Sequence, residues 1–376
     1  MNHKISRFLS ENSPETPCLV VDLDAIDAAY ELLCRYLSSA SIYYAVKANP
    51  AREIVELLAR RGSNFDVASR AEIELCLASG ASADRLSFGN TIKKERDIDF
   101  AYRAGIRLFA FDSEAELEKL ARVAEGARVF CRLLVSCEGA EWPLSRKFGC
   151  APEMAIALLR KARRLGLDPY GVSFHVGSQQ TDLAQWDGAI GAVARMFTVL
   201  AEADINLRML NIGGGLPAHY RGNVLPVEQY AEAINAALTR HFGNHLPDII
   251  VEPGRSLVGD AGVIESEVVL IADKGDGSGK RWVYLDIGKF NGLAETMGES
   301  IKYRIEAPGC AGPAGPVILA GPTCDSADIL YERTEYSLPL DLAVGDKVEI
   351  LAAGAYTASY SSVGFNGFPP LRTYCI

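Results

Sequence analysis

The sequence predicts an α/β protein built on a (β/α)8 barrel, with a second domain made mostly of β-strands. Two observations carry this prediction. Eight short apolar segments alternate with segments of helical periodicity, which is the pattern of parallel strands joined by crossover helices. Chemically active side chains then follow directly after several of these strands, and a barrel gathers the carboxyl ends of its strands at one rim, where its chemistry takes place.

Strands are expected where β-branched and aromatic residues run together between turn residues. The expected strands are 42–46, 64–68, 85–89, 107–111, 128–135, 170–175, 207–212 and 248–252. Helices are expected near 52–61, 70–79, 93–104, 113–124, 152–165, 184–203 and 227–242. From about residue 261, short strands separated by Gly, Pro and Asp replace this rhythm. We therefore place the barrel at residues 23–260 and a β-sandwich at 1–22 and 261–376.

The composition is that of a reduced globular protein. The chain has 376 residues, of which 49% are hydrophobic, so it can bury at least one large core. Its net charge of −10 disfavours nucleic acid and anionic membranes and mildly favours cationic small molecules. Its nine cysteines show no Cys-x-x-Cys or zinc-like spacing, and its first residues lack the apolar core of a signal peptide. We expect a cytoplasmic protein without a metal site.

One lysine ends an apolar strand. The segment 42–50 reads Ile-Tyr-Tyr-Ala-Val-Lys-Ala-Asn-Pro, and its lysine is Lys47. Burial of an ammonium group is unfavourable, so we expect the pKa of Lys47 to fall toward neutrality. A neutral amine among apolar neighbours can react with an aldehyde. An ordinary lysine that reaches solvent from a strand end fits the same segment.

Three further groups follow expected strands. His175 stands beside a glycine turn, and Gly213–Gly215 can wrap backbone N–H groups around an anion at the usual phosphate site of a barrel. Glu252 could pair with a heteroaromatic nitrogen, and Arg255 with a phosphate. Taken singly, these groups also fit a structural histidine, a tight turn and a surface ion pair. Taken together with an amine, they describe a pyridoxal 5'-phosphate (PLP) site.

Seven motifs occur in one order along the chain: Tyr44–Asn49, Phe65–Ser69, His175–Ser178, Gly213–Gly215, Glu252–Arg255, Cys324–Asp325 and Gly354–Thr357. They resemble the alanine-racemase-fold decarboxylases of basic amino acids, the ornithine/lysine/diaminopimelate decarboxylase family. The resemblance extends from about residue 16 to the C-terminus. It implies a barrel with a β-sandwich, PLP as cofactor, and a head-to-tail homodimer whose active sites are shared across the interface.

The resemblance also assigns roles to individual residues. It implies that Lys47 binds the cofactor covalently, that His175 stacks on the pyridine ring and that Glu252 pairs with the ring nitrogen. Asp66 and Glu72 lie near the bound lysine and position it. The remaining cofactor contacts, most of them to the phosphate, are Ser178, Gly213, Gly214, Gly215, Gly254, Arg255 and Tyr356.

Cys324 and Asp325 are expected to reach the site from the partner subunit. The thiol would protonate Cα after carbon dioxide leaves, and the carboxylate would bind the distal amine of the substrate. Tyr356 and Phe365 are expected to contact the substrate as well. Glu295 or Glu299 could supply a second acid, although either could also be a solvated acid on a short helix.

The expected activity is decarboxylation of L-ornithine to putrescine, because Cys324-Asp325-Ser326 looks like the ornithine-type motif. Decarboxylation of L-lysine to cadaverine is left open. A diaminopimelate decarboxylase, for which Cys-Glu-Ser is usual, is the alternative, and a non-catalytic member of the family is a third interpretation. Eukaryotic members carry an arginine where Pro143 stands, and whether Arg146 replaces it is also left open.

Overall fold

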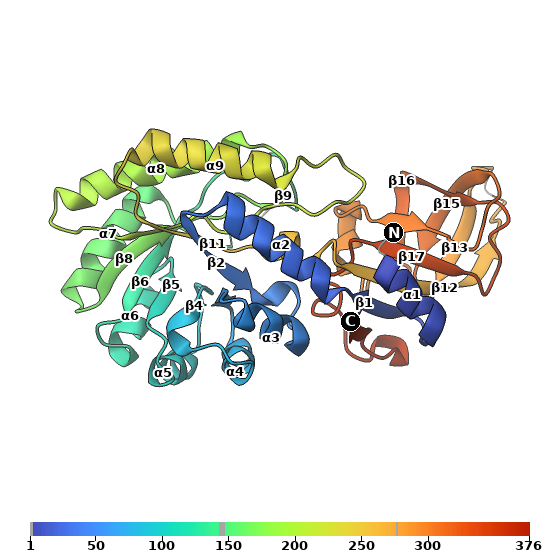
Figure 1. Cartoon of the computed structure of the whole chain (residues 1–376), viewed down its shortest axis with the longest axis horizontal. Coiled ribbons are helices and arrows are strands. Elements are labelled where there is room, and N and C mark those ends of the chain that lie inside the picture. Colours follow the sequence, from blue (N-terminus) through green and yellow to red (C-terminus); the bar gives the residue numbers. More distant parts are fainter. Residues whose placement is uncertain (1–2, 143–146, 276) are drawn as a thin grey trace. The chain divides into compact units, whose positions relative to one another are not determined.

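The fold is described from a computed structural model for residues 3–142, 147–275 and 277–376. These residues divide into two compact units (Figure 1). The barrel unit comprises residues 27–217 and 224–254, and the sheet unit comprises the described parts of 1–26, 218–223 and 255–376. The predicted domain borders, at 22/23 and 260/261, stay a prediction. Pro143 and Arg146 lie outside the described residues.

The barrel unit confirms the predicted fold. In the described chain, eight parallel strands close into a barrel in the order β10-β11-β2-β3-β4-β5-β6-β8, with β10 pairing back to β8. Each overlaps one expected strand. Their bounds are β2 (Ala40–Ala45), β3 (Asn64–Val67), β4 (Leu86–Phe88), β5 (Leu108–Phe111), β6 (Arg128–Arg132), β8 (Asp168–Ser173), β10 (Met209–Asn211) and β11 (Asp248–Val251).

Helices follow most of the barrel strands and lie around them in Figure 1. They are α2 (Leu23–Tyr36), α3 (Arg52–Arg60), α4 (Arg70–Ala78), α5 (Glu95–Arg103), α6 (Glu114–Val123), α7 (Pro152–Arg164), α8 (Ala184–Ala201) and α9 (Val227–Phe242). Short 3-10 turns occur at η1 (Val46–Ala48) and η2 (Ala83–Arg85), and β7 (Ala140–Trp142) pairs with β9 (Ser178–Gln180). Ser69 and Ser113 accept hydrogen bonds at the starts of α4 and α6, which fixes where those helices begin.

The sheet unit is mostly antiparallel, with the order β14-β17-β12-β13-β15-β16, while β1 pairs with both β12 and β18. Its strands are β1 (Cys18–Val21), β12 (Gly262–Ala272), β13 (Arg281–Leu285), β14 (Arg304–Glu306), β15 (Ala314–Ala320), β16 (Ile329–Pro339), β17 (Lys347–Leu351) and β18 (Arg372–Cys375). Its helical segments are α1 (His3–Asn12), α10 (Arg255–Val258), η3 (Ala294–Glu299) and η4 (Phe365–Gly367).

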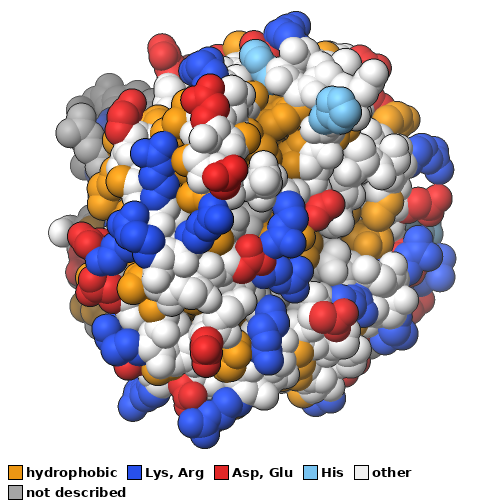
Figure 2. All heavy atoms as spheres, turned by 90° about the vertical axis from the view of Figure 1, so that its left-hand side faces the viewer, with side chains coloured by type: hydrophobic (Ala, Val, Ile, Leu, Met, Phe, Trp, Pro, Cys, Tyr) orange, Lys and Arg blue, Asp and Glu red, His pale blue; other side chains and the backbone are white. Residues whose placement is uncertain are grey.

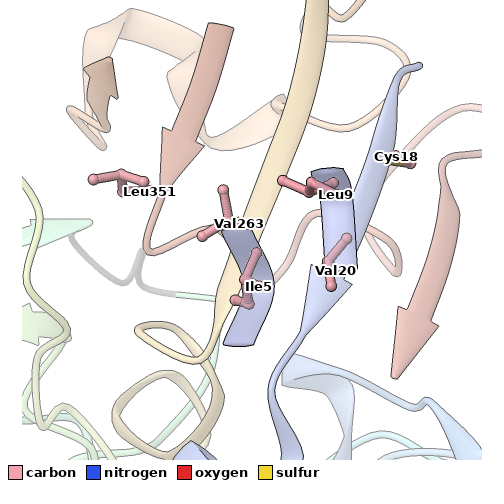
Figure 3. Close-up of a cluster of buried hydrophobic side chains, with 6 residues drawn as sticks. All are labelled: Ile5, Leu9, Cys18, Val20, Val263 and Leu351. Atoms are coloured by element: carbon pink, nitrogen blue, oxygen red, sulfur yellow. The ribbon is translucent and has the colours of Figure 1, made fainter. Parts of the chain in front are cut away.

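Helix α1 was not predicted from the sequence, which reads as polar there. Ile5 and Leu9 are one turn apart, and both are buried in one cluster with Cys18, Val20, Val263 and Leu351. Figure 3 shows the two side chains of α1 beside Val20 and Val263 of the sheet. Phe8 of the same helix also packs against this cluster, so the apolar face of α1 covers the start of β12, where β1 and β17 pair with it.

The surface shows no large area of one charge on the face that Figure 2 draws, where Lys and Arg side chains are interspersed with Asp and Glu. Within the described residues, no helix combines the length and the apolar character needed to span a membrane.

Candidate active site

Lys47 lies beside Asp66 at the carboxyl rim of the barrel. Its Nζ is 3.7 Å from Asp66 Oδ2. Strand β2 ends at Ala45, and Lys47 lies in the turn η1, where the Tyr44 hydroxyl donates to the Asn49 carbonyl at 2.8 Å. The expected burial of Lys47 is wrong, because its side chain is 47% exposed. The turn lifts the lysine off the sheet, so the apolar strand itself does not enclose the amine.

Asp66 is the buried member of this pair. Its side chain is 5% exposed, and its Oδ1 atom has no hydrogen-bond partner among the described residues. Burial raises the pKa of Asp66 well above its usual value, and Glu252 raises it further, while Lys47 opposes this shift. Gly89 makes room for the carboxylate, because a Cβ at that position would lie 1.9 Å from Oδ1.

Glu72 has a structural partner in addition to its place near Lys47. Its Oε2 accepts a hydrogen bond from Ala68 N at 2.7 Å, and its own N–H is directed to Ser69 Oγ at 3.3 Å. The Ser69 hydroxyl caps α4, and the Glu72 carboxylate reaches back to the N–H of the residue before that cap, which is a variant of the capping box. Burial raises the pKa of Glu72, and the Ala68 hydrogen bond and the charge of Lys47 lower it. The same carboxylate therefore both starts the helix and faces the lysine.

His175 follows β8 and is fixed in one tautomer. Gly177 N donates to its Nδ1 at 3.0 Å, so the proton of the neutral ring lies on Nε2. Burial lowers the pKa of His175 well below its usual value, and the positive charges of Arg132 and Lys47 lower it further. A neutral, oriented imidazole is suited to stack on a ring or to donate from Nε2. Ser178 lies three residues on, at the start of β9.

The glycine loop and Glu252 are joined at the neighbouring strand ends. Glu252 N donates to the Gly213 carbonyl at 2.8 Å, and a Cβ on Gly214 would lie 2.7 Å from the Glu252 carbonyl oxygen. Gly213 has φ +68° and Gly215 has φ +108°, which glycine adopts without strain. On the other side, a Cβ on Gly254 would lie 2.9 Å from Ala48 Cβ, so this residue packs against the lysine turn.

In the sheet unit, Arg255 is held by a bidentate ion pair. Its two terminal nitrogens donate to both carboxylate oxygens of Glu295 at 2.7 Å each, and one also donates to the Tyr220 hydroxyl at 2.6 Å. Both side chains are buried. Every oxygen of Glu295 thus already faces a guanidinium. Its proposed contact with the substrate stays a prediction, as does the phosphate contact of Arg255.

Tyr356 also belongs to this cluster, since the Arg255 guanidinium carbon lies 4.8 Å from the centre of its ring. Its backbone has φ +59°, a left-handed conformation that an aromatic residue rarely adopts. Such backbone strain collects at functional sites. Gly354 just before it is required, because a Cβ there would lie 1.8 Å from the Val258 carbonyl oxygen.

Cys324 and Asp325 lie exposed on the loop between β15 and β16. Cys324 N donates to Asn366 Oδ1 at 3.2 Å, and the Asp325 carboxylate accepts from Ala327 N at 2.8 Å. The buried Asp328 holds this loop in place, because its carboxylate accepts hydrogen bonds from the N–H groups of Lys289 and Thr323. Gly288 and Gly321 leave room for it, since a Cβ at either position would collide with the carboxylate.

Glu299 and Phe365 occupy the same unit. The Glu299 carboxylate accepts hydrogen bonds from the N–H groups of residues 332–334 and from the Thr334 hydroxyl. Burial alone would raise the pKa of Glu299, but these hydrogen bonds hold it at about 2. The ring centre of Phe365 lies 4.7 Å from that of Phe290, with the two rings tilted by 45°. Substrate contacts of both residues stay predictions.

The residues at the barrel rim fit PLP. A buried carboxylate oxygen of Asp66 lacks a partner among the described residues, although such atoms are normally paired. Beside it lie a lysine amine, a neutral oriented histidine, an acid and a glycine loop too closely packed for any side chain. Each matches one functional group of the cofactor: aldehyde, ring, ring nitrogen and phosphate. Sequence reasoning missed Gly89, Asn211 and Asp328, whose importance depends on contacts between distant segments.

Comparisons with known proteins agree with this geometry. Residues 23–259 match the model of the family described as "Pyridoxal-dependent decarboxylase, pyridoxal binding domain". The chain is 35% identical to the lysine/ornithine decarboxylase of Selenomonas ruminantium, over 98% of this chain and 91% of that protein. It is 32% identical to antizyme inhibitor 2 of Xenopus laevis, over 97% and 82% of the two chains. The solved lysine/ornithine decarboxylase of Vibrio vulnificus in complex with cadaverine is 31% identical, with a TM-score of 0.88 over 100% of this chain and 98% of that one.

Proposed function

Because the chain belongs to the family of pyridoxal-dependent decarboxylases, which are carboxy-lyases that use PLP, we propose that it converts L-ornithine to putrescine. L-Lysine, which would give cadaverine, is proposed as a second substrate, in line with the names of two relatives. The observation that carries the choice of a basic substrate is the exposed Cys324–Asp325 loop, which presents one thiol and one carboxylate side by side.

The cofactor, when bound, supplies an electron-withdrawing ring that accepts the electron pair left at Cα as carbon dioxide departs. The protein supplies the placement of that ring. Lys47 would hold the aldehyde carbon, and Glu252 would accept the N–H of the ring nitrogen. The neutral His175 would lie against the ring face. Glu252 favours decarboxylation because a carboxylate keeps the ring nitrogen protonated, which strengthens electron withdrawal.

Phosphate binding is assigned to the glycine loop Gly213–Gly215, Ser178, Gly254, Arg255 and Tyr356. The Gly213 N–H donates to Asn211 Oδ1, so the N–H groups of Gly214 and Gly215 would be the ones that face the phosphate in a concave anion site. Arg255 would contribute charge from its ion pair with Glu295, which prevents the guanidinium from rotating. Asp66 and Glu72 would keep the Lys47 amine in place before the cofactor arrives.

Asp325 is the acid that we assign to the distal ammonium group of the substrate, because Glu295 and Glu299 are already hydrogen-bonded within the sheet unit. The thiol of Cys324 would deliver a proton to Cα after carbon dioxide leaves. We infer that both act in the active site of a partner subunit, so that the enzyme works as a homodimer. Tyr356 and Phe365 would line the substrate chain. Because a proton-donating thiol must stay reduced, we also propose a cytoplasmic location, testable by cell fractionation.

A substrate panel tests the proposed reaction. We expect kcat/KM for L-ornithine to exceed that for meso-diaminopimelate by about a hundredfold or more, because Asp325 would repel a distal carboxylate. L-Lysine should fall between them and L-arginine should be poor. Cys324→Ala should divert part of the product from the amine to the aldehyde. Preference for diaminopimelate would replace the proposal with the second activity, and absence of turnover on all four amino acids would reject both.

Mixing two variants that are each deficient in forming the amine product tests the shared site. Lys47→Ala and Cys324→Ala are each expected to be deficient, but random exchange of subunits makes about half of the dimers mixed, with one intact site each. We therefore expect activity to return to about a quarter of that of the unmodified enzyme. Failure of activity to return, while gel filtration shows that subunits exchange, would place Lys47 and Cys324 in the same subunit's site.

A further inference from the structure

We propose that Asn211 is a positioning residue for the cofactor: its side-chain amide fixes the carboxylate of Glu252 and ties that acid to the glycine loop through a group that does not titrate. This inference rests on the proposed pairing of Glu252 with the ring nitrogen of PLP. Asn211 is the last residue of β10 and lies directly before the glycine loop.

The two ends of the Asn211 side chain bond to two different parts of the site. Its Nδ2 donates to Glu252 Oε1 at 2.5 Å, and its Oδ1 accepts from Gly213 N at 2.8 Å. The amide orientation follows from these partners. Gly213 N–H can only donate, so it must face the amide oxygen, which leaves the NH2 group for the carboxylate. Reversing the amide would oppose two donors at one end and two acceptors at the other.

The amide also completes a junction between two strand ends. Ile212 N donates to the Ile250 carbonyl at 2.9 Å, and Glu252 N donates to the Gly213 carbonyl at 2.8 Å. Asn211 adds the side-chain bond across the same junction and is fully buried. A small rotation of the amide would therefore move the acid and the phosphate loop together. The distance between a ring nitrogen and a phosphate is fixed in one rigid cofactor, so both must be set at once.

An aspartic acid at position 211 could donate this hydrogen bond to Glu252 only while its carboxyl group is protonated. Two carboxylates with oxygens 2.5 Å apart, as at this contact, cannot both be ionised without strong repulsion, and one pKa of such a pair rises. The amide donates its proton at every pH and leaves Glu252 as an acceptor. The other charged groups here are Asp66, Lys47, Glu72 and Arg132, with a neutral His175. A substitution at position 211 leaves all of these residues in place, so a new pH dependence would arise from position 211 and Glu252.

The test compares four variants reconstituted with PLP: Asn211→Asp, Asn211→Leu, Glu252→Gln and the control Asn235→Asp. Asn235 is a part-buried amide on α9 that donates to the Tyr36 carbonyl at 3.0 Å, so it controls for the loss of any amide. Two quantities are measured between about pH 6 and pH 9: the absorbance spectrum of the bound cofactor and its dissociation constant from equilibrium dialysis.

We expect Asn211→Asp to match the unmodified protein at the low end of this range, where the new carboxyl group carries the shared proton. As pH rises it should show a spectral transition that the unmodified protein and Asn235→Asp lack, with affinity for PLP falling about tenfold. Asn211→Leu should bind PLP about tenfold more weakly at every pH. If Asn211→Leu does not fold, Asn211→Asp decides the question, since it keeps the size of the side chain.

Two results would overturn the inference, and they are distinguishable. If Glu252→Gln changes the cofactor spectrum while both Asn211 variants leave spectrum and affinity unchanged, Glu252 is the ring partner but Asn211 does not position it. If Glu252→Gln also leaves the spectrum unchanged, the proposed pairing of Glu252 itself fails, and the role of Asn211 fails with it.

Discussion

Two of the lysine–carboxylate pairs in the barrel unit differ in how completely they are enclosed. Lys93 is fully buried, lies 3.0 Å from Glu116, and donates to the carbonyl oxygens of Asn90 and Ala110. Lys47 is 47% exposed and lies 3.7 Å from Asp66, whose second oxygen is unpaired among the described residues. Glu116 Oε1 lacks a hydrogen bond as well, but it faces the Lys93 ammonium, and Glu116 Oε2 faces Lys119 at 2.5 Å. Among the described residues, Asp66 Oδ1 has neither a hydrogen bond nor an ion pair, so only the second pair leaves an oxygen without a cation.

The contrast teaches how to separate structural from functional charge. Burial lowers the pKa of Lys93 to about 8, but Glu116 opposes that shift, and two carbonyl oxygens accept hydrogen bonds from the ammonium group. Because its side chain is fully buried, this amine is not accessible to an aldehyde. Asp66 keeps a raised pKa and an unpaired oxygen, which is unfavourable unless a ligand completes it. The open pair is therefore the one that we assign to the cofactor.

The largest expected effect comes from the open pair. Lys47→Ala should lower decarboxylation by about a thousandfold or more and abolish the covalent cofactor absorbance, because the nucleophilic amine is removed. Stability should change by less than about 1 kcal/mol, since the side chain is half exposed. Turnover and absorbance, together with urea unfolding, measure both parts. Retained absorbance in Lys47→Ala would contradict the assignment.

Removing one partner of the buried Lys93–Glu116 pair should affect stability, whereas Lys47→Ala should affect activity. Glu116→Leu leaves the buried ammonium of Lys93 without its carboxylate, which should lower the free energy of unfolding by about 3 kcal/mol. The loss should shrink as pH rises, because a neutral Lys93 is tolerated in a buried site. The double variant Lys93→Met/Glu116→Leu should recover part of the stability. Unchanged urea midpoints in Glu116→Leu would show that the pair is not structural.

At Asp66 we expect a smaller change in the free energy of unfolding, and in the opposite direction to that of Glu116→Leu. Its folded pKa is raised, so the folded protein binds more protons than the unfolded chain above the usual aspartate range, and the carboxylate lowers stability as pH rises. Asp66→Asn should therefore stabilise the protein before PLP is added, near neutral pH but not in acid, and should weaken PLP binding. Thermal unfolding at several pH values, with and without PLP, checks both. Destabilisation at neutral pH would refute the argument.

The smallest effect is expected from Glu72→Gln, which removes the negative charge near Lys47 and keeps the hydrogen-bond acceptor at the start of α4. Glutamine can still accept from Ala68 N, so α4 keeps its cap and stability should change by less than about 0.5 kcal/mol. Affinity for PLP should fall about threefold, because the field at Lys47 weakens. Ser69→Ala is the matched control, since it removes the cap and keeps the charge. A larger loss of affinity in Ser69→Ala would reverse this interpretation.

The sequence predicted what depends on local pattern. All eight barrel strands follow from short apolar runs, and the fold class is confirmed. The exposure of Lys47 could not be predicted, because it depends on β2 ending at Ala45 and on the 3-10 turn that then contains Lys47. The partner of Glu295 could not be predicted either, since Arg255 lies forty residues away along the chain. Asn211 carried a local signal, a polar residue ending a buried strand before three glycines, but only the contact with Glu252 gives it meaning.

The hydrogen bonds of Asp328 hold the Cys324–Asp325 loop independently of Asp325, which bears on how substrate selectivity could change. Asp328 and the two glycines packed against it hold the loop on its buried side, while the exposed Asp325 carboxylate accepts a hydrogen bond from Ala327 N. The residue that holds the loop, Asp328, is thus different from Asp325, the residue that we propose recognises the substrate. Exchange of the acid at 325 for a longer or neutral side chain should therefore retune selectivity without refolding the segment, which makes this position a practical starting point for directed evolution.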